Sequence, residues 1–145
     1  MSIPFGAHIP FVAHLGFTLE KFEGGHSELH YVPRPEHLNS FDVTHGGAVM
    51  TLLDVAMATA ARSIEPAMGV VTIEMKTSFM RPAQGRVRVI GQVLHATASM
   101  AFTEGRVLDE QGRVCAHATG TFKFLRALPT ADREVKPLAR HAGSD

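Results

Sequence analysis

The 145-residue chain has one cysteine, one tyrosine, no tryptophan and no net formal charge. Cys115 cannot form a disulfide within a single chain, so the cysteine content predicts a reducing compartment, the cytoplasm. Lys and Arg together number 14, the same as Asp and Glu, whereas nucleic-acid binding requires a basic surplus. The charge balance therefore predicts no nucleic-acid partner.

Targeting signals and long apolar stretches are also lacking. The first residues contain no basic segment followed by an apolar run, so they do not have the pattern of a signal peptide. We find no run that approaches the roughly 18 apolar residues of a membrane helix, and we expect no membrane partner. The hydrophobic content of 45% is sufficient for one core, which predicts a single domain over residues 1–145.

The hydrophobic pattern predicts one long helix and several strands. Residues 46–62 are apolar nearly all round, which is typical of a buried helix. Alternating or apolar segments bounded by turn residues predict strands at 16–22, 26–32, 71–79, 86–96, 99–109 and 113–125. We expect the last four to form a meander. The fold class is thus α+β, with one long central helix packed on an antiparallel sheet of about five to six strands.

The two ends of the chain differ from its middle. Residues 1–14 contain two prolines and predict an N-terminal arm, while the core is expected to span about 15–125. Residues 127–145 carry charges of both signs and two prolines, which predicts a loose tail. We find neither an internal repeat nor a linker long enough to indicate a second domain.

A His-Gly-Gly triplet, His45-Gly46-Gly47, opens the long helix, and Asp54 interrupts its apolar sequence. Glycines at a helix N-terminus leave backbone N–H groups bare, which is a common way to bind an oxyanion. The Asp54 carboxylate can serve as general base or nucleophile. Together they predict a site for attack on a carbonyl. We expect Thr44 to cap the helix.

The same residues carry a family resemblance. Asn39, His45-Gly46-Gly47, Asp54 nine positions after the histidine, and the segment 70–82 resemble hotdog-fold acyl-CoA thioesterases of the phenylacetyl-CoA type. The segments 102–107 and 112–122 also match the closing strands of that family. The resemblance covers about Leu15 to Phe124 and implies the hotdog fold and hydrolysis of an acyl-CoA thioester without metal or cofactor.

The resemblance also implies roles for individual residues. Asp54 occupies the position of the catalytic carboxylate, and Thr72 that of the hydroxyl that orients the carboxylate or the water. The backbone amide of Gly46, helped by the side chain of Asn39, would hold the thioester oxygen. We expect His45 to orient the loop rather than to transfer protons. Because burial disfavours the charged carboxylate, we expect a raised pKa for Asp54.

Helix geometry indicates that this site needs two chains. Gly46 and Asp54 are eight residues apart, or roughly 12 Å along the axis at 1.5 Å per residue. A base and an oxyanion donor must both lie about 3 Å from the reacting group. We therefore expect a homodimer in which Gly46 and Asn39 of one chain face Asp54 and Thr72 of the other. Because the family often pairs dimers, we also expect a homotetramer.

Further residues are candidates for binding the substrate. Gly47 is a candidate substrate contact, Met50 and Met57 are candidate contacts of the acyl group, and Arg81 and Arg86 of the CoA phosphates. The sequence does not identify the acyl group: aryl-acetyl, benzoyl-like and medium-chain groups all fit. It also leaves open whether Asp54 activates water or forms a mixed anhydride.

Several alternatives accompany this interpretation. Asp54 could instead form a structural ion pair with Arg62 or Arg81. His26 and His30 share one face of a strand but lack further ligands nearby, so we predict no metal site, and we expect Cys115 to be a core residue. The alternative functions are a non-catalytic acyl-CoA-binding protein or, less favoured, an enoyl-CoA hydratase or dehydratase.

Overall fold

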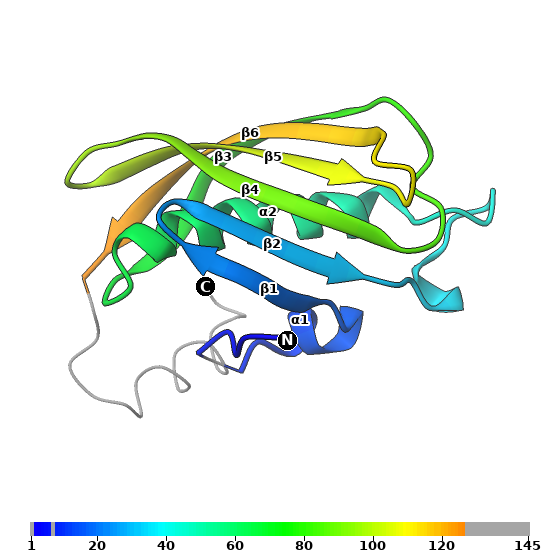
Figure 1. The fold of residues 1–145 in the computed structure, drawn as a ribbon, viewed down its shortest axis with the longest axis horizontal. Helices are drawn as coiled ribbons and strands as arrows, with labels where there is room; N and C mark the ends of the chain where they lie inside the picture. Colours follow the sequence, from blue (N-terminus) through cyan, green and yellow to red (C-terminus); the bar gives the residue numbers. More distant parts are fainter. Residues whose placement is uncertain (1, 7, 127–145) are drawn as a thin grey trace.

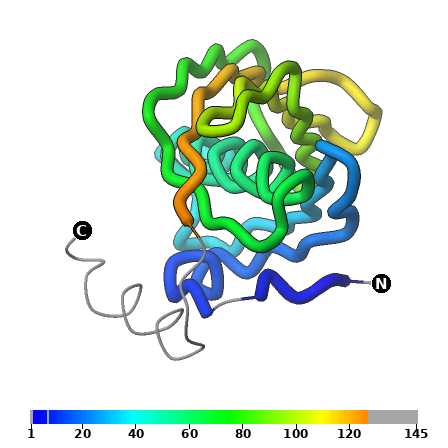
Figure 2. The backbone as a smooth tube through the Cα atoms, turned by 90° about the vertical axis from the view of Figure 1, so that its left-hand side faces the viewer, coloured from blue at the N-terminus to red at the C-terminus, as the bar shows by residue number. Residues whose placement is uncertain are grey.

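A six-stranded antiparallel sheet curls around one long helix. The computed structural model describes residues 2–6 and 8–126. The central helix is α2 (Gly46–Ile64), and the view along it shows the sheet surrounding it on most sides (Figures 1 and 2). The strands are β1 (Thr18–Glu23), β2 (His26–Tyr31), β3 (Gly69–Phe79), β4 (Val87–Ala96), β5 (Met100–Leu108) and β6 (Val114–Leu125). This is the predicted α+β hotdog arrangement.

Two short helices complete the described part of the chain. Helix α1 (Pro10–Leu15) precedes β1 and falls at the end of the expected N-terminal arm. The 3-10 turn η1 (Pro35–His37) follows β2. The expected loose tail, residues 127–145, lies outside the described residues.

The strand order is β1-β2-β4-β5-β6-β3, with each neighbouring pair antiparallel. The last four strands were expected to form a meander. That prediction is wrong for β3, because only β4, β5 and β6 follow one another in the sheet. Strand β3 pairs with β6, and β4 pairs with β2, so residues 80–86 carry the chain from one side of the sheet towards the other. Alternation predicts that a segment is a strand, but strand neighbours depend on long-range pairing. As a result β3 lies at an edge of the sheet.

Helix α2 and the sheet approach each other closely at glycines. A Cβ atom on Gly91 of β4 would lie 2.2 Å from the backbone oxygen of Ala56 on the helix. The same oxygen accepts a hydrogen bond of 2.6 Å from the Ser27 hydroxyl of β2. Nine residues of α2 are buried: Ala48, Val49, Leu52, Leu53, Ala56, Met57, Thr59, Ala60 and Ala61.

The apolar character of α2 corrects one expectation. Residues 46–64 are long and apolar enough, by length and composition, to cross a membrane, whereas the sequence was expected to contain no such segment. In the fold this helix is the centre of the core, and its apolar residues pack against the inner face of the sheet. Burial inside the sheet is therefore a sufficient reason for its composition.

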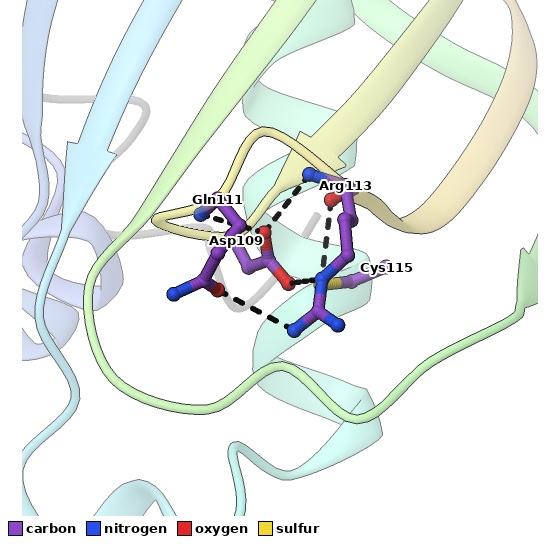
Figure 3. A network of polar contacts seen from close by, with 4 residues as sticks. All are labelled: Asp109, Gln111, Arg113 and Cys115. Carbon is purple, nitrogen blue, oxygen red and sulfur yellow. Dashed lines mark hydrogen bonds and ion pairs between the residues drawn. The ribbon is translucent and has the colours of Figure 1, made fainter.

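The hairpin between β5 and β6 is closed by the Asp109 carboxylate. It accepts hydrogen bonds from the backbone N–H groups of Gln111 (3.0 Å) and Arg113 (2.9 Å) and from Nε of Arg113 (2.8 Å), as Figure 3 shows. These bonds hold the pKa of Asp109 below its usual range. Cys115 follows the turn and is 1% exposed, which confirms it as a core residue. This end of the sheet lies beside the helix N-terminus and forms one wall of the site described next.

Candidate functional site

The residues that precede α2 form a narrow hairpin. The N–H of His45 donates to the carbonyl of His37 (2.8 Å), and the N–H of Asn39 donates to the carbonyl of Val43 (2.9 Å). The turn ends at Asp42, whose φ of 61° lies in the left-handed region that Asp tolerates. Asn39 and Gly46 are thus brought to the two arms of one hairpin.

Asn39 both forms the turn and retains free donors. Its Oδ1 accepts from the N–H groups of Phe41 (2.8 Å) and Val43 (3.4 Å), which is the turn-forming role of an Asn. The amide nitrogen has no partner among the described residues. Its two N–H groups therefore remain available to a ligand.

His45, not Thr44, caps helix α2. Its Nδ1 accepts from the N–H of Gly47 (2.8 Å), so in the neutral ring the proton resides on Nε2. The backbone conformation of His45, with φ of −58° and ψ of 139°, is extended, as a capping residue requires. The expected cap at Thr44 is wrong because the helix begins one residue later than that cap would need.

This cap leaves one glycine amide free. The N–H of Gly47 is used by His45, and the N–H groups of Ala48 and Val49 both donate to the carbonyl of His45. The N–H of Gly46 has no partner among the described residues. It is therefore the bare amide at the positive end of the helix dipole.

The free amide of Gly46 borders a cavity of about 650 Å³. Phe79 forms part of the wall, with its Cζ atom 3.5 Å from where a Cβ of Gly46 would lie. The cavity is mostly apolar, with Asn39 and Arg81 among its polar lining, and we call it the amide pocket. Its lining comprises Asn39, Phe41, Val43, Thr44, Gly46, Val49, Phe79, Met80, Arg81, Pro82, Ala83, Cys115 and Ala116.

Asp54 lies at a second, shallower pocket. Its Oδ1 accepts a 2.6 Å hydrogen bond from the Thr72 hydroxyl of β3. Burial raises the pKa of Asp54 above its usual value, and the Thr72 bond offsets part of that rise. The pocket is lined by Met50, Thr51, Asp54, Thr72 and Met75, and we call it the carboxylate pocket. Neither Arg62 nor Arg81 pairs with Asp54 in the described part of the chain, so the ion-pair alternative is wrong.

The two pockets share no lining residue. The sequence-predicted site residues therefore fall into two groups within one chain. Asn39 and Gly46 border the amide pocket, with His45 capping the helix beside them, whereas Asp54, Thr72 and Met50 form the carboxylate pocket. One chain alone does not bring the base and the oxyanion donors together.

Three candidate substrate contacts lie away from both pockets. Met57 is completely buried, and its Cε would lie 3.1 Å from a Cβ on Gly120, so it belongs to the packing between helix and sheet. Its place on the apolar helix made Met57 a candidate contact of the acyl group, but its side chain faces the core. Gly47 is exposed and uses its N–H in the cap, and Arg86 is exposed outside either lining. Of the two arginines, only Arg81 borders the amide pocket.

Sequence reasoning missed the aromatic residues of the amide pocket. Phe41 is 82% exposed and Phe79 is 55% exposed, although both are large and apolar. Phe41 follows the turn-forming Asn39 by two positions, and Phe79 ends β3. Their exposure beside a free amide is visible only in the fold, because the segments 39–44 and 79–83 are brought together by a bond from the Thr44 N–H to the Ala83 carbonyl (3.0 Å).

Comparison with known proteins identifies a matching family and several relatives of this chain. The family model described as thioesterase superfamily matches residues 41–116, which include the Asp54–Thr72 pair and the lining of the amide pocket except Asn39. A relative from Saccharolobus solfataricus, provisionally classed as an esterase, is 33% identical over 85 residues. That match covers 58% of this chain and 61% of the relative, so the chain spans less than two thirds of its length.

Longer matches connect the chain to proteins with more specific names. A medium/long-chain acyl-CoA thioesterase of Escherichia coli strain K12 is 26% identical over 137 residues, covering 81% of this chain and 87% of the relative. The structure of a mutant of the phenylacetic acid degradation protein PaaI from Thermus thermophilus superposes with a TM-score of 0.72 at 26% identity. That superposition covers 79% of this chain and 97% of the other.

Proposed function

Because this chain belongs to the thioesterase superfamily, we propose that it hydrolyses an acyl-CoA thioester to the free acid and CoA, at a site shared by two copies. The observation that carries the proposal is the Asp54–Thr72 pair. A carboxylate whose pKa is raised by burial, and which is oriented by a hydroxyl at 2.6 Å, has the basicity and geometry of a general base or nucleophile.

The proposed chemistry needs only groups that the chain supplies. The thioester oxygen accepts hydrogen bonds from the Gly46 N–H and the Asn39 amide, which stabilise the negative charge that develops there. Asp54 either takes a proton from the attacking water or attacks the carbonyl carbon itself, forming a mixed anhydride that water then hydrolyses. In both routes the C–S bond breaks, CoA leaves as thiolate and is protonated, and one water is consumed.

The edge strand β3 supports the proposal of a shared site. Its outer edge has no strand partner among the described residues, although β3 is eleven residues long. Val71, Ile73 and Phe79 on this strand are 42%, 52% and 55% exposed. A long edge with exposed apolar residues favours pairing with another chain. Pairing about a two-fold axis would create two equivalent sites, each combining the amide pocket of one copy with the carboxylate pocket of the other.

A homotetramer and the binding of CoA are extensions of this proposal. Leu94 and Phe102 are exposed on strands β4 and β5 and offer apolar area for pairing dimers. Arg81, at the rim of the amide pocket, is the candidate for a CoA phosphate, since its guanidinium can bind phosphate through two donors. The apolar lining of the pocket suits an apolar acyl group. The cytoplasmic location and the absence of nucleic-acid and membrane partners stay predictions.

The test is thiol release from short, medium, long and aryl acyl-CoA esters, with wild type compared with Asp54→Asn. We expect turnover by the wild type and a loss in kcat of about 10²-fold or more in the variant. Glu23→Gln is the matched control: it is an acid-to-amide change at an exposed residue that ends β1, on the opposite edge of the sheet from β3 and outside both pocket linings.

Other results would assign another function. Binding of acyl-CoA without thiol release by the wild type would indicate a non-catalytic binding protein. Hydration of an enoyl-CoA without loss of CoA would indicate a hydratase. Turnover that persists in Asp54→Asn would remove Asp54 from the catalytic role.

A further inference from the structure

His37 stands at the root of the hairpin that carries the oxyanion donors. Its carbonyl accepts from the N–H of His45, the residue directly before Gly46, and Asn39 follows it by two positions. The two arms are held together again by the bond between the Asn39 N–H and the Val43 carbonyl. Any rotation of the backbone at His37 therefore moves Asn39 and the start of α2 together.

The side chain of His37 is anchored to the sheet. It is 5% exposed, and its Nδ1 accepts hydrogen bonds from the Tyr31 hydroxyl at the end of β2 (2.8 Å) and from the Arg34 N–H (3.2 Å). The Tyr31 and His37 rings stack with centroids 5.8 Å apart, and Tyr31 is only 1% exposed. A buried tyrosine on a paired strand is a rigid support for the loop.

We propose that His37, held by Tyr31, is a positioning residue that sets the location of the Asn39 amide and the Gly46 N–H. It acts through the backbone of the hairpin, because its side chain borders neither the amide pocket nor the carboxylate pocket. The inference rests on the proposed function only in assigning Asn39 and Gly46 as oxyanion donors; the anchoring itself is independent of that assignment.

The surroundings of the ring favour the neutral form that this anchor needs. Since Nδ1 accepts two hydrogen bonds, the proton of the ring resides on Nε2, which is buried and has no partner among the described residues. Burial is the main cause that lowers the pKa of His37, followed by the positive charge of Arg34. Glu36 acts in the opposite direction, and the neighbouring ring of His14 adds to the lowering.

Three substitutions at one position separate positioning from general packing. Asn places its oxygen close to the site of Nδ1 and can accept the same two bonds, whereas Gln places its polar group farther out and Leu has none. We expect His37→Leu and His37→Gln to lose about tenfold or more in kcat, with a smaller change in KM, because misplaced donors weaken transition-state binding. His37→Asn should stay within about threefold of the wild type.

A second measurement does not depend on turnover. Hydrogen–deuterium exchange at the Asn39 and His45 amides should be faster in His37→Leu than in the wild type and close to the wild type in His37→Asn. Phe17→Leu is the packing control: Phe17 meets the Tyr31 ring edge-on, at 6.5 Å, but does not bond His37, so it should leave kcat and this exchange unchanged. If His37→Leu does not fold, Tyr31→Phe removes the same support with less change in volume.

Equal losses in the Asn and Leu variants, or unaltered exchange in the Leu variant, would overturn the positioning role. A wild type that hydrolyses none of the esters would refute the proposed function, while the exchange data would still decide whether His37 anchors the hairpin. The two failures are therefore distinguishable.

Discussion

The hydroxyl of Thr72 donates to Oδ1 of Asp54 over 2.6 Å and thereby joins edge strand β3 to central helix α2. Burial raises the pKa of this carboxyl, and the bond from Thr72 opposes the rise. The position of the carboxylate and its proton affinity thus depend on the same contact.

Replacement of Thr72 should change the pH dependence of hydrolysis. Asp54 must be ionised to act, so kcat/KM should fall as the pH drops through its pKa, at a higher pH than for an ordinary Asp. Thr72→Val removes the bond that lowers this pKa, so the acid limb should move to higher pH and kcat should fall. Thr72→Ser keeps the hydroxyl and should resemble the wild type. An unshifted acid limb in Thr72→Val would contradict this role.

Asp54→Asn should be inactive but more stable than the wild type at neutral pH. A carboxyl whose pKa is higher in the folded state contributes stability below its unfolded pKa, and this contribution is lost as the pH rises through the folded value. Asn cannot ionise, so it avoids that loss. Urea unfolding at neutral and acidic pH should show the advantage of the variant shrinking as the pH falls. A variant that is less stable at neutral pH would refute the explanation.

Gly46→Pro should remove the oxyanion donor while keeping the helix. Proline is well tolerated at the first helical position, and the extended conformation of His45 is the one that a following proline favours. Since the Gly46 N–H has no partner in the described part of the chain, only the proposed contact is lost. We expect kcat to fall by about 10²–10³-fold. Gly46→Ala retains the N–H and places its Cβ at an ordinary 3.5 Å from Phe79, so it serves as control.

Co-expression of Gly46→Pro and Asp54→Asn chains tests whether the site is shared. Each variant alone should be inactive, but a mixed dimer would have one site with an intact Gly46 from one chain and an intact Asp54 from the other. Random pairing at equal amounts should restore about a quarter of the wild-type activity. If a single chain held the complete site, mixing would restore nothing.

Gly91→Ala should strongly destabilise the fold. The added Cβ would lie 2.2 Å from the Ala56 backbone oxygen and 2.6 Å from the Ser27 hydroxyl, so helix and sheet must separate. Such overpacking costs about 1–3 kcal/mol of unfolding free energy, or more where backbone must move. Denaturant unfolding measures the loss. Gly69→Ala, which meets nothing within 4 Å, should leave stability nearly unchanged.

The helix, the strands and the identity of the polar groups could be predicted because their causes are local. The apolar sequence of 46–62 indicates a buried helix, and α2 occupies Gly46–Ile64. The alternation that begins at Val71 indicates a strand, and β3 occupies Gly69–Phe79. The motif also predicts polar groups of the site: Asn39 and Gly46 border the amide pocket, and Asp54 borders the carboxylate pocket. Helix rise alone predicts that Gly46 and Asp54 lie too far apart to act together within one chain.

Only the tertiary structure decided which groups meet. It placed β3 at the edge beside β6, oriented Met57 into the core, and capped α2 with His45 so that the Gly46 amide stays free. It also brought Tyr31 against His37 at the root of the loop. Periodicity and turn chemistry depend on neighbours a few residues away, and so they can be read along the chain. Strand order, hydrogen-bond partners and burial depend on segments that are distant in sequence, and these are settled only when the whole sheet closes around its helix.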